Sequence, residues 1–143
     1  MSDLFLLAEG GHAVTIEYPV FSSEEVVIGM MSVAFMPDHL IGQHSEPAVS
    51  RTDYSVMVAQ PAGLILYDAD PEEIGKETFN ESMYADFPEL LEFAKEFSGK
   101  WSGNATYSFY DEGFEKVVQK EACWTTVGIH NAEWRLILMH PFL

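Results

Sequence analysis

The last third of the chain contains three segments of strand character that follow one another with no helical segment between them. They cover residues 105–110, 117–127 and 133–140 and are rich in β-branched and aromatic residues. Parallel neighbours need a crossover connection, usually a helix, whereas antiparallel neighbours need only a turn. This order predicts a mainly antiparallel sheet and argues against a sheet built from βαβ units.

Two earlier pairs of segments have the pattern of β-hairpins. Residues 54–60 and 64–68 flank Pro61-Ala62-Gly63, in which the proline presets φ for a turn and the glycine can adopt the left-handed conformation that closes it. Residues 13–21 and 26–35 form the other pair, separated by a short polar break. Together with the three late strands, these hairpins predict a sheet of five to seven strands.

Helical signals are fewer and separated. Pro37 suits the first turn of a helix that we expect to end before Pro47, and Asp70 begins one turn that Gly75 ends. A longer amphipathic helix is expected over residues 87–98, with Asp86 as its N-cap and Gly99 as its stop. The predicted class is therefore α+β, an antiparallel sheet with its helices packed on one face.

Composition restricts the function classes. The chain has 143 residues, and its 7 Lys and Arg against 23 Asp and Glu give a formal net charge of −16. Such a field repels phosphate backbones and anionic lipid headgroups, so we expect neither nucleic-acid binding nor membrane contact by this chain.

The apolar run Leu4–Ala8 is too short for a signal peptide or a membrane span. Cys123, the single cysteine, has no disulfide partner and is expected to be a small buried hydrophobe.

The central and closing segments resemble Cache (PAS-like) sensor domains. The run Val56–Asp68 (VMVAQPAGLILYD) followed by Ile74-Gly75-Lys76 is similar to the hairpin and "iGk" turn of that family. The closing run Val118–Val127, followed by Trp134–Leu138 (WRLIL), is similar to the family's last two strands. This resemblance implies a PAS-like sheet and a sensory, extracytoplasmic role in binding a small ligand; without it, the protein would be placed in the cytoplasm.

The first part of the chain is similar to a different part of the same family. Residues 16–21 and 28–33 resemble the final hairpin of a preceding Cache module. We therefore expect two parts. Residues 1–49 form a hairpin with a connecting helix, which either ends a preceding module or is an added hairpin on the same sheet. Residues 50–143 form one PAS-like module. The long N-terminal helix that usually begins a family member is not visible here.

Aromatic and acidic side chains supply the candidate ligand site. In a PAS-like sheet, Tyr67, Tyr107 and Trp124 would face the helices, and Asp68 and Asp70 lie at the start of the loop that covers the sheet. Rings beside carboxylates favour a cationic or a neutral amphipathic ligand, through cation–π contacts and charge pairing. Arg135 is not expected to anchor a carboxylate ligand, because Glu133 is a neighbouring acidic partner.

Metal binding and catalysis find little support in the sequence. The spacing of Asp68, Asp70 and Glu72 could indicate a Ca²⁺ loop, but an EF-hand needs a glycine and a glutamate at later positions that hold Glu73 and Phe79. No catalytic, metal or cofactor motif is present, so we expect none of these sites and no enzyme activity. The Asn-x-Ser/Thr patterns at Asn80 and Asn104 leave glycosylation open.

The sequence therefore leads to three hypotheses. The first is a small-molecule-sensing domain of a signal-transduction protein, with its ligand held between the sheet and the covering loops. The second is a structural or dimerisation module of the same fold without a ligand, and homodimer formation is left open in both. The distant third is a small acid–base enzyme that uses Asp68 or Asp70 with a histidine.

Overall fold

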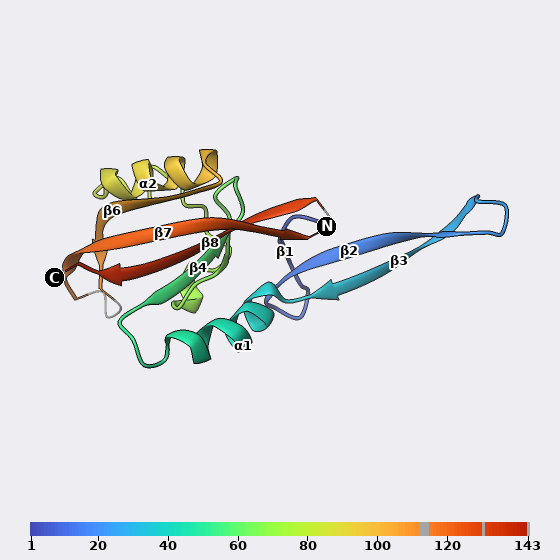
Figure 1. The fold of residues 1–143 in the computed structure, drawn as a ribbon, viewed down its shortest axis with the longest axis horizontal. Helices are drawn as coiled ribbons and strands as arrows, with labels where there is room; N and C mark the ends of the chain where they lie inside the picture. Colours follow the sequence, from blue (N-terminus) through green and yellow to red (C-terminus); the bar gives the residue numbers. More distant parts are fainter. Residues whose placement is uncertain (112–114, 130, 143) are drawn as a thin grey trace.

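A five-stranded antiparallel sheet forms the body of the protein. The computed structural model describes residues 1–111, 115–129 and 131–142. The sheet has the order β5–β4–β8–β7–β6, so the last strand lies in the centre, beside the first strand of the sheet (Figure 1). Its strands are β4 (Ser55–Ala59), β5 (Ile65–Tyr67), β6 (Ser102–Tyr110), β7 (Val117–Ile129) and β8 (Ala132–Pro141). The predicted α+β class with a mainly antiparallel sheet is confirmed.

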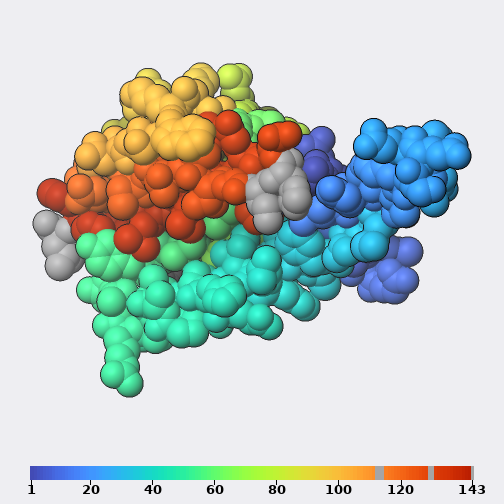
Figure 2. All heavy atoms as spheres, turned by 45° about the vertical axis from the view of Figure 1, so that its right-hand side comes forward, coloured from blue at the N-terminus to red at the C-terminus, as the bar shows by residue number. Residues whose placement is uncertain are grey.

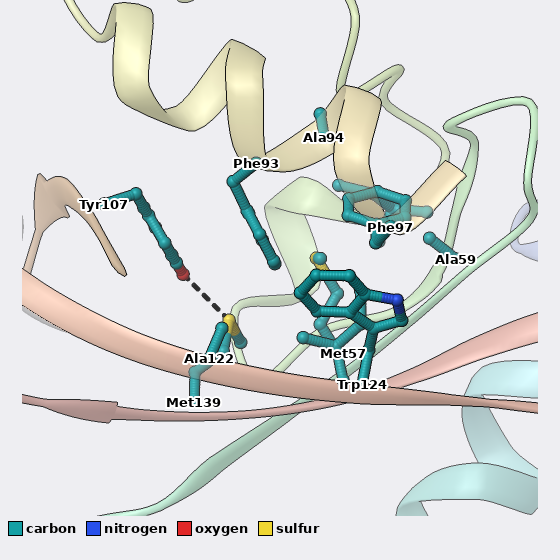
Figure 3. Close-up of a cluster of buried hydrophobic side chains, with 11 residues drawn as sticks. Met57, Ala59, Phe93, Ala94, Phe97, Tyr107, Ala122, Trp124 and Met139 are labelled. Atoms are coloured by element: carbon teal, nitrogen blue, oxygen red, sulfur yellow. Dashed lines mark hydrogen bonds between the residues drawn. The ribbon is translucent and has the colours of Figure 1, made fainter. Parts of the chain in front are cut away.

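Helix α2 (Pro88–Gly99) covers one face of this sheet with aromatic rings. Phe93 and Phe97 are almost completely buried, and Figure 3 shows them pointing down from the helix toward Met57 and Trp124 of the sheet. The Phe93 ring stacks on Tyr107 with 4.7 Å between ring centroids. Burying a phenylalanine side chain contributes about 2–3 kcal/mol, so these rings supply much of the energy that holds α2 in place.

Arg135 of β8 forms hydrogen bonds with the carbonyl end of α2. Its Nε donates to the Phe97 carbonyl at 2.8 Å and its Nη2 to the Ser98 carbonyl at 3.3 Å. The last turn of α2 has no basic residue of its own, so a buried guanidinium from the sheet supplies the positive charge that helix carbonyls favour. The predicted pairing of Arg135 with Glu133 is also present, at 3.2 Å.

Helix α1 (Pro37–Val49) lies on the opposite face of the sheet, where Ile41 and Val49 pack on a cluster that includes Val56 and Val58 (Figure 1). We expected both helices on one face, and that detail is wrong. The reason is visible in β4, whose residues from Val56 to Ala59 are all buried. Such a strand has an apolar side chain on each face and therefore needs cover on both sides.

Three local expectations also differ from the structure. Helix α1 continues through Pro47 to Val49, because a proline in the last turn removes only one hydrogen bond. Asp86 does not cap α2: the N-cap residue is Phe87, and Pro88 at the first helical position needs no donor partner. Cys123 is exposed, because it alternates with the buried Ala122 and Trp124 along β7 and faces away from α2.

The N-terminal segment forms a separate three-stranded sheet in the order β1–β2–β3. Its strands are β1 (Phe5–Leu6), β2 (His12–Phe21) and β3 (Val27–Phe35). Only the base of the β2–β3 hairpin meets the rest of the protein, and its tip extends far from the body (Figures 1 and 2). The hairpin is therefore not an addition to the five-stranded sheet.

Replacing Arg135 with methionine should lower the free energy of unfolding by about 3 kcal/mol, because a buried and a partly buried helix carbonyl lose charge-assisted hydrogen bonds. Urea unfolding followed by tryptophan fluorescence measures this difference. The matched control is Arg51→Met, which alters an exposed arginine and should change the stability by less than about 0.5 kcal/mol. Equal effects of the two substitutions would contradict the role given to Arg135.

Candidate ligand cavity

A cavity of about 400 Å³ lies between α2, the sheet and the loop that follows β5. Its walls combine apolar side chains of α2 and the central strands with acidic and aromatic side chains from the loop and from the end of β6. The lining residues include Met57, Asp68, Asp70, Glu73, Tyr84, Leu90, Phe93, Tyr107, Phe109, Tyr110, Asp111, Lys120 and Met139. This volume is in the range of small-ligand sites.

Asp68 is a titratable group that the cavity perturbs strongly. It directly follows β5, and its Oδ1 accepts a hydrogen bond from the backbone N–H of Asp70 at 2.9 Å. Burial, together with the nearby charge of Glu73, raises its pKa to about 7, although the Asp70 N–H and the charge of Lys120 oppose the shift. Near neutral pH this carboxyl group is therefore poised between its protonated and ionised forms.

A short 3-10 helix, η1 (Pro71–Glu73), places Glu73 beside Asp68. As predicted, the Asp70 side chain caps this turn, accepting from the Glu72 N–H at 2.9 Å. Glu73 is held at both oxygens, by Lys76 Nζ at 2.8 Å and by the Tyr84 hydroxyl at 2.9 Å. Burial, together with this bond to Glu73, raises the pKa of Tyr84, so its hydroxyl remains a donor.

Stacked and edge-on aromatic rings form another part of the lining. Tyr107 is buried, stacks on Phe93 and donates its hydroxyl to Met139 Sδ at 2.9 Å (Figure 3). Burial and the charge of Asp68 raise the pKa of Tyr107, which keeps the phenol neutral. Phe109 packs edge-on against Tyr84, with 6.0 Å between ring centroids. A ligand in this cavity would contact both aromatic rings and carboxylates.

The charges around the cavity are strongly unequal. Among its described lining residues, Asp68, Asp70, Glu73 and Asp111 are acidic, and Lys120 is the one basic residue. The Lys120 ammonium lies 5.7 Å from the Phe109 ring centroid, over its face. The site therefore has a negative field, which attracts cations and repels free carboxylates.

Three of the five predicted site residues, Asp68, Asp70 and Tyr107, line this cavity. Trp124 lies behind it, edge-on to Phe93, with its Nε1 donating to the Lys100 carbonyl at 3.2 Å. Tyr67 is on the opposite face of the sheet, in the cluster that α1 covers.

A bulge in β5 explains the position of Tyr67. Ala59 pairs with Ile65, but the preceding residue Val58 pairs with Tyr67, so Leu66 is one extra residue on β5. This extra residue reverses the alternation of side chains. The Tyr67 ring then packs on α1, where a Cβ on Gly42 would lie 3.3 Å from Tyr67 Cε2. The alternation assumed from the sequence would have turned Tyr67 toward α2.

Several lining residues were not among the predicted site residues. Phe109 could have been found from strand periodicity, since it lies two residues from Tyr107 on β6 and therefore on the same face. Lys120 could have been found from register, because it pairs with Tyr107 across the β6–β7 ladder. Glu73 and Tyr84 depend on how the irregular loop folds back, and no periodic signal marks them.

No metal site can be assigned among the described residues, because no three His, Cys, Asp or Glu side chains are grouped to hold an ion. Asp68 and Asp70 accept hydrogen bonds from backbone N–H groups of their own loop instead.

In the first Asn-x-Ser pattern, Asn80 Oδ1 accepts from Ser82 Oγ at 2.7 Å and from the Met83 N–H at 3.1 Å.

The raised pKa of Asp68 predicts a specific pH dependence of stability. The unfolded chain releases this proton near pH 3.8 and the folded protein near pH 7, so the folded state becomes less stable as pH rises between these values. Replacing Asp68 with asparagine removes this loss. Relative to the wild type, Asp68→Asn should therefore gain at most about 3 kcal/mol between pH 5 and pH 8. Urea unfolding at both pH values measures it, with exposed Asp86→Asn as the control; a pH-independent difference would contradict the prediction.

Comparison with known proteins places this fold among sensory domains. No protein-family model matches the sequence, and no curated protein matches it. Among solved structures, an extracellular ligand binding receptor from Desulfohalobium retbaense is 26% identical with a TM-score of 0.70, covering 97% of this chain and 22% of the receptor chain. The periplasmic sensory domain of the Campylobacter jejuni chemoreceptor Tlp1 is 12% identical with a TM-score of 0.65, over 96% of this chain and 46% of that domain.

A third similar structure has a ligand. The ligand-binding domain of the Pseudomonas aeruginosa amino acid chemoreceptor PctB, in complex with L-arginine, is 13% identical with a TM-score of 0.63, covering 96% of this chain and 52% of that domain. The chain thus spans about half or less of the lengths of these structures. Among the described residues, no helix is both long and apolar enough to cross a membrane. The chain has the fold of extracellular sensory domains of signalling proteins, and the Cache-type resemblance predicted from its sequence is confirmed.

Proposed function

We propose that this chain is the small-molecule-sensing part of an extracytoplasmic receptor domain, and that its ligand occupies the cavity under α2. The observation that carries this proposal is the position of Asp68, a largely buried carboxyl group facing an aromatic-lined space of about 400 Å³. A largely buried carboxyl group whose charge is only partly compensated costs stability. Such a cost is typical of functional sites.

A cationic group is the ligand feature that the cavity fits best. An ammonium beside Asp68 would stabilise the ionised carboxylate, and a cavity lined by aromatic rings favours a cation through cation–π contacts. Lys120, the basic residue among the described lining residues, already lies over the Phe109 ring, so a ligand carboxylate has few partners. A neutral amphipathic ligand is the alternative, in which protonated Asp68 would donate a hydrogen bond.

The similar structures support this assignment in general terms. PctB holds L-arginine, and a Pseudomonas fluorescens chemoreceptor, CtaA, holds L-leucine. These domains are less than 25% identical to the chain. They therefore support only the general proposal that a domain of this fold binds amino-acid-sized molecules. The preference for a cationic group rests on the residues of this chain.

The route of a response is also part of the proposal. The loop that carries Asp70 and Glu73 ends at Gly75, whose φ of +85° requires glycine. A Cβ at Gly75 would lie 2.5 Å from Nε2 of His12 at the base of β2. Ligand binding would shift the population of loop conformations. The contact between Gly75 and His12 would transmit this shift from residues 50–143 to residues 1–49. We propose these two ranges as the two units of the chain.

Primary amines should stabilise the protein against heat, because a ligand that binds only the folded state raises the melting temperature. Differential scanning fluorimetry at pH 8 with L-arginine, L-lysine, putrescine and agmatine measures this effect. We expect a rise with at least one of these amines and none with acetate or succinate. A panel in which only the organic acids stabilise the protein would contradict the cationic assignment, and no response to any small molecule would favour a ligand-free module.

Asp68→Asn should weaken binding of a responding amine at least tenfold, because the variant retains the shape of the side chain but not its charge. Isothermal titration calorimetry measures the dissociation constant, with Asp86→Asn as the exposed control. Unchanged affinity in Asp68→Asn would place the amine elsewhere.

Wild-type affinity for the amine should fall as pH decreases below about 7, approaching tenfold per pH unit, because protonated Asp68 no longer attracts a cation. Titrations between pH 5.5 and 8.5 measure this dependence. Asp68→Asn should show a flatter profile, and parallel profiles for the two proteins would contradict the role of Asp68.

A further inference from the structure

Tyr107 has a buried hydroxyl group in the lining of the ligand cavity. The residue is only 3% exposed and lines the cavity from β6. Its hydroxyl donates to Met139 Sδ (Figure 3), and among the described residues it has no other hydrogen-bond partner. A thioether sulfur is a weak acceptor compared with an oxygen. The cavity therefore contains a buried donor whose present partner is a poor one.

A second tyrosine of the cavity has a much stronger partner. The Tyr84 hydroxyl donates to a carboxylate oxygen of Glu73 at 2.9 Å. Buried polar groups in proteins generally have good hydrogen-bond partners, because an unmet requirement costs stability. Tyr107 departs from this pattern although it lines the same cavity. A few polar groups in an apolar cavity wall are the groups that fix the orientation of a ligand.

Met139 can release this donor at little cost. Its side chain also lines the cavity. Methionine is unbranched and has three rotatable bonds, so its sulfur can shift within the cavity wall. The Tyr107 ring, by contrast, is held by stacking on Phe93, with an angle of 3° between the ring planes. A ligand oxygen can therefore replace the sulfur as the acceptor while the phenol ring stays in place.

The Tyr107 hydroxyl lies near the carboxyl group that we propose for the ligand cation. Besides burial, the charge of Asp68 raises the pKa of Tyr107, so the two groups are close enough to interact. Oδ1 of Asp68 accepts from the Asp70 N–H, and within the described part of the chain its Oδ2 accepts no hydrogen bond. The cavity thus offers an acceptor for an ammonium and a donor for an oxygen, within the reach of one small molecule.

The ligand oxygen should belong to an uncharged group. Four acidic side chains, those of Asp68, Asp70, Glu73 and Asp111, line the cavity, against Lys120 as the one basic residue among its described lining residues. This negative field repels a carboxylate but not a neutral carbonyl group. An amide carbonyl is also a better acceptor than the sulfur that it would replace.

Much of the remaining lining is apolar. The sheet and α2 contribute Met57, Ile65, Leu90, Ala94 and Phe97. Such a surface favours a hydrocarbon side chain, because its burial removes apolar area from water. We propose that the cavity binds an α-amino amide with an apolar side chain, whose ammonium lies beside Asp68 and whose carbonyl accepts from Tyr107. This inference rests on the proposed cation site and adds a second anchoring point to it.

Three molecules with the same side chain test this inference on the 143-residue chain. They are L-leucinamide, 3-methylbutylamine, which lacks the carbonyl, and L-leucine, which carries a carboxylate. The α-amino pKa is about 7.7–8.0 and the pKa of Asp68 is about 7. At pH 7.5 a large share of both groups is therefore charged, and isothermal titration calorimetry at this pH measures the three affinities.

We expect L-leucinamide to bind about fivefold or more tighter than 3-methylbutylamine, the effect of one neutral hydrogen bond. It should bind about tenfold or more tighter than L-leucine, because the acidic lining repels the carboxylate. Equal affinities of L-leucinamide and 3-methylbutylamine, or tighter binding by L-leucine, would overturn this inference and leave the cation site at Asp68 standing. Binding by none of the three would overturn the cation site and this inference with it.

Amides of free amino acids and the amino termini of short peptides share this chemistry. L-leucyl-L-alaninamide separates the two sources, because it has the same α-amino amide group followed by a second residue. An affinity equal to or above that of L-leucinamide would assign the cavity to peptide amino termini. A clearly lower affinity would assign it to amides of single amino acids.

Tyr107→Phe retains the ring that stacks on Phe93 and removes the hydroxyl group. In this variant, L-leucinamide should lose its advantage over 3-methylbutylamine. Tyr67→Phe is the matched control, since Tyr67 is a buried tyrosine on the opposite face of the sheet, and it should retain the full advantage. An unchanged advantage in Tyr107→Phe would contradict the role of this hydroxyl. The wild-type comparison does not depend on how either variant folds.

Discussion

The attachment of α2 to the sheet is the constraint on which the candidate site depends. At the carbonyl end, Phe97 is fully buried and Arg135 bonds the last carbonyls of the helix. Leu90, Phe93, Ala94 and Phe97 of the same helix line the cavity. A helix held firmly at its carbonyl end can cover a cavity without collapsing into it, because the buried aromatic rings fix its distance from the sheet.

The cavity is maintained at an energetic cost. Asp68 lies where desolvation works against its charge, and the Asp70 N–H together with Lys120 offsets only part of that penalty. Removing the negative charge at this position would remove this penalty. Conflicts between local chemistry and stability are typical of binding sites, because the missing interaction is the one that a ligand supplies.

Much of the architecture could be predicted from the sequence because it follows from periodicity and turn chemistry. The three late strands and the Pro61–Gly63 turn have local signals, and the structure contains all of them. The position of α1 could not be assigned correctly from the strand order alone, although the unbroken apolar run of β4 indicated two covered faces. A sequence pattern shows that a face is buried but does not show which element buries it.

The candidate site was predictable only where regular strands carry it. Tyr107 lines the cavity because β6 alternates without interruption, whereas one extra residue at Leu66 turns Tyr67 to the other side. No residue type marks this bulge, since Leu66 suits a regular strand as well. Glu73 and Tyr84 meet through a loop between η1 and α2, and their contact depends on tertiary folding.

The central claim is that the largely buried carboxyl group of Asp68, which titrates near neutral pH, binds a cationic group of the ligand in the cavity under α2. The most direct test is a pH titration of the Asp68 side-chain carboxyl by ¹³C NMR, with and without a saturating amine. The account predicts a midpoint near 7 in the free protein and a clearly lower midpoint when the amine is bound. A midpoint near 4 in the free protein, or one that the bound amine leaves unchanged, would contradict it.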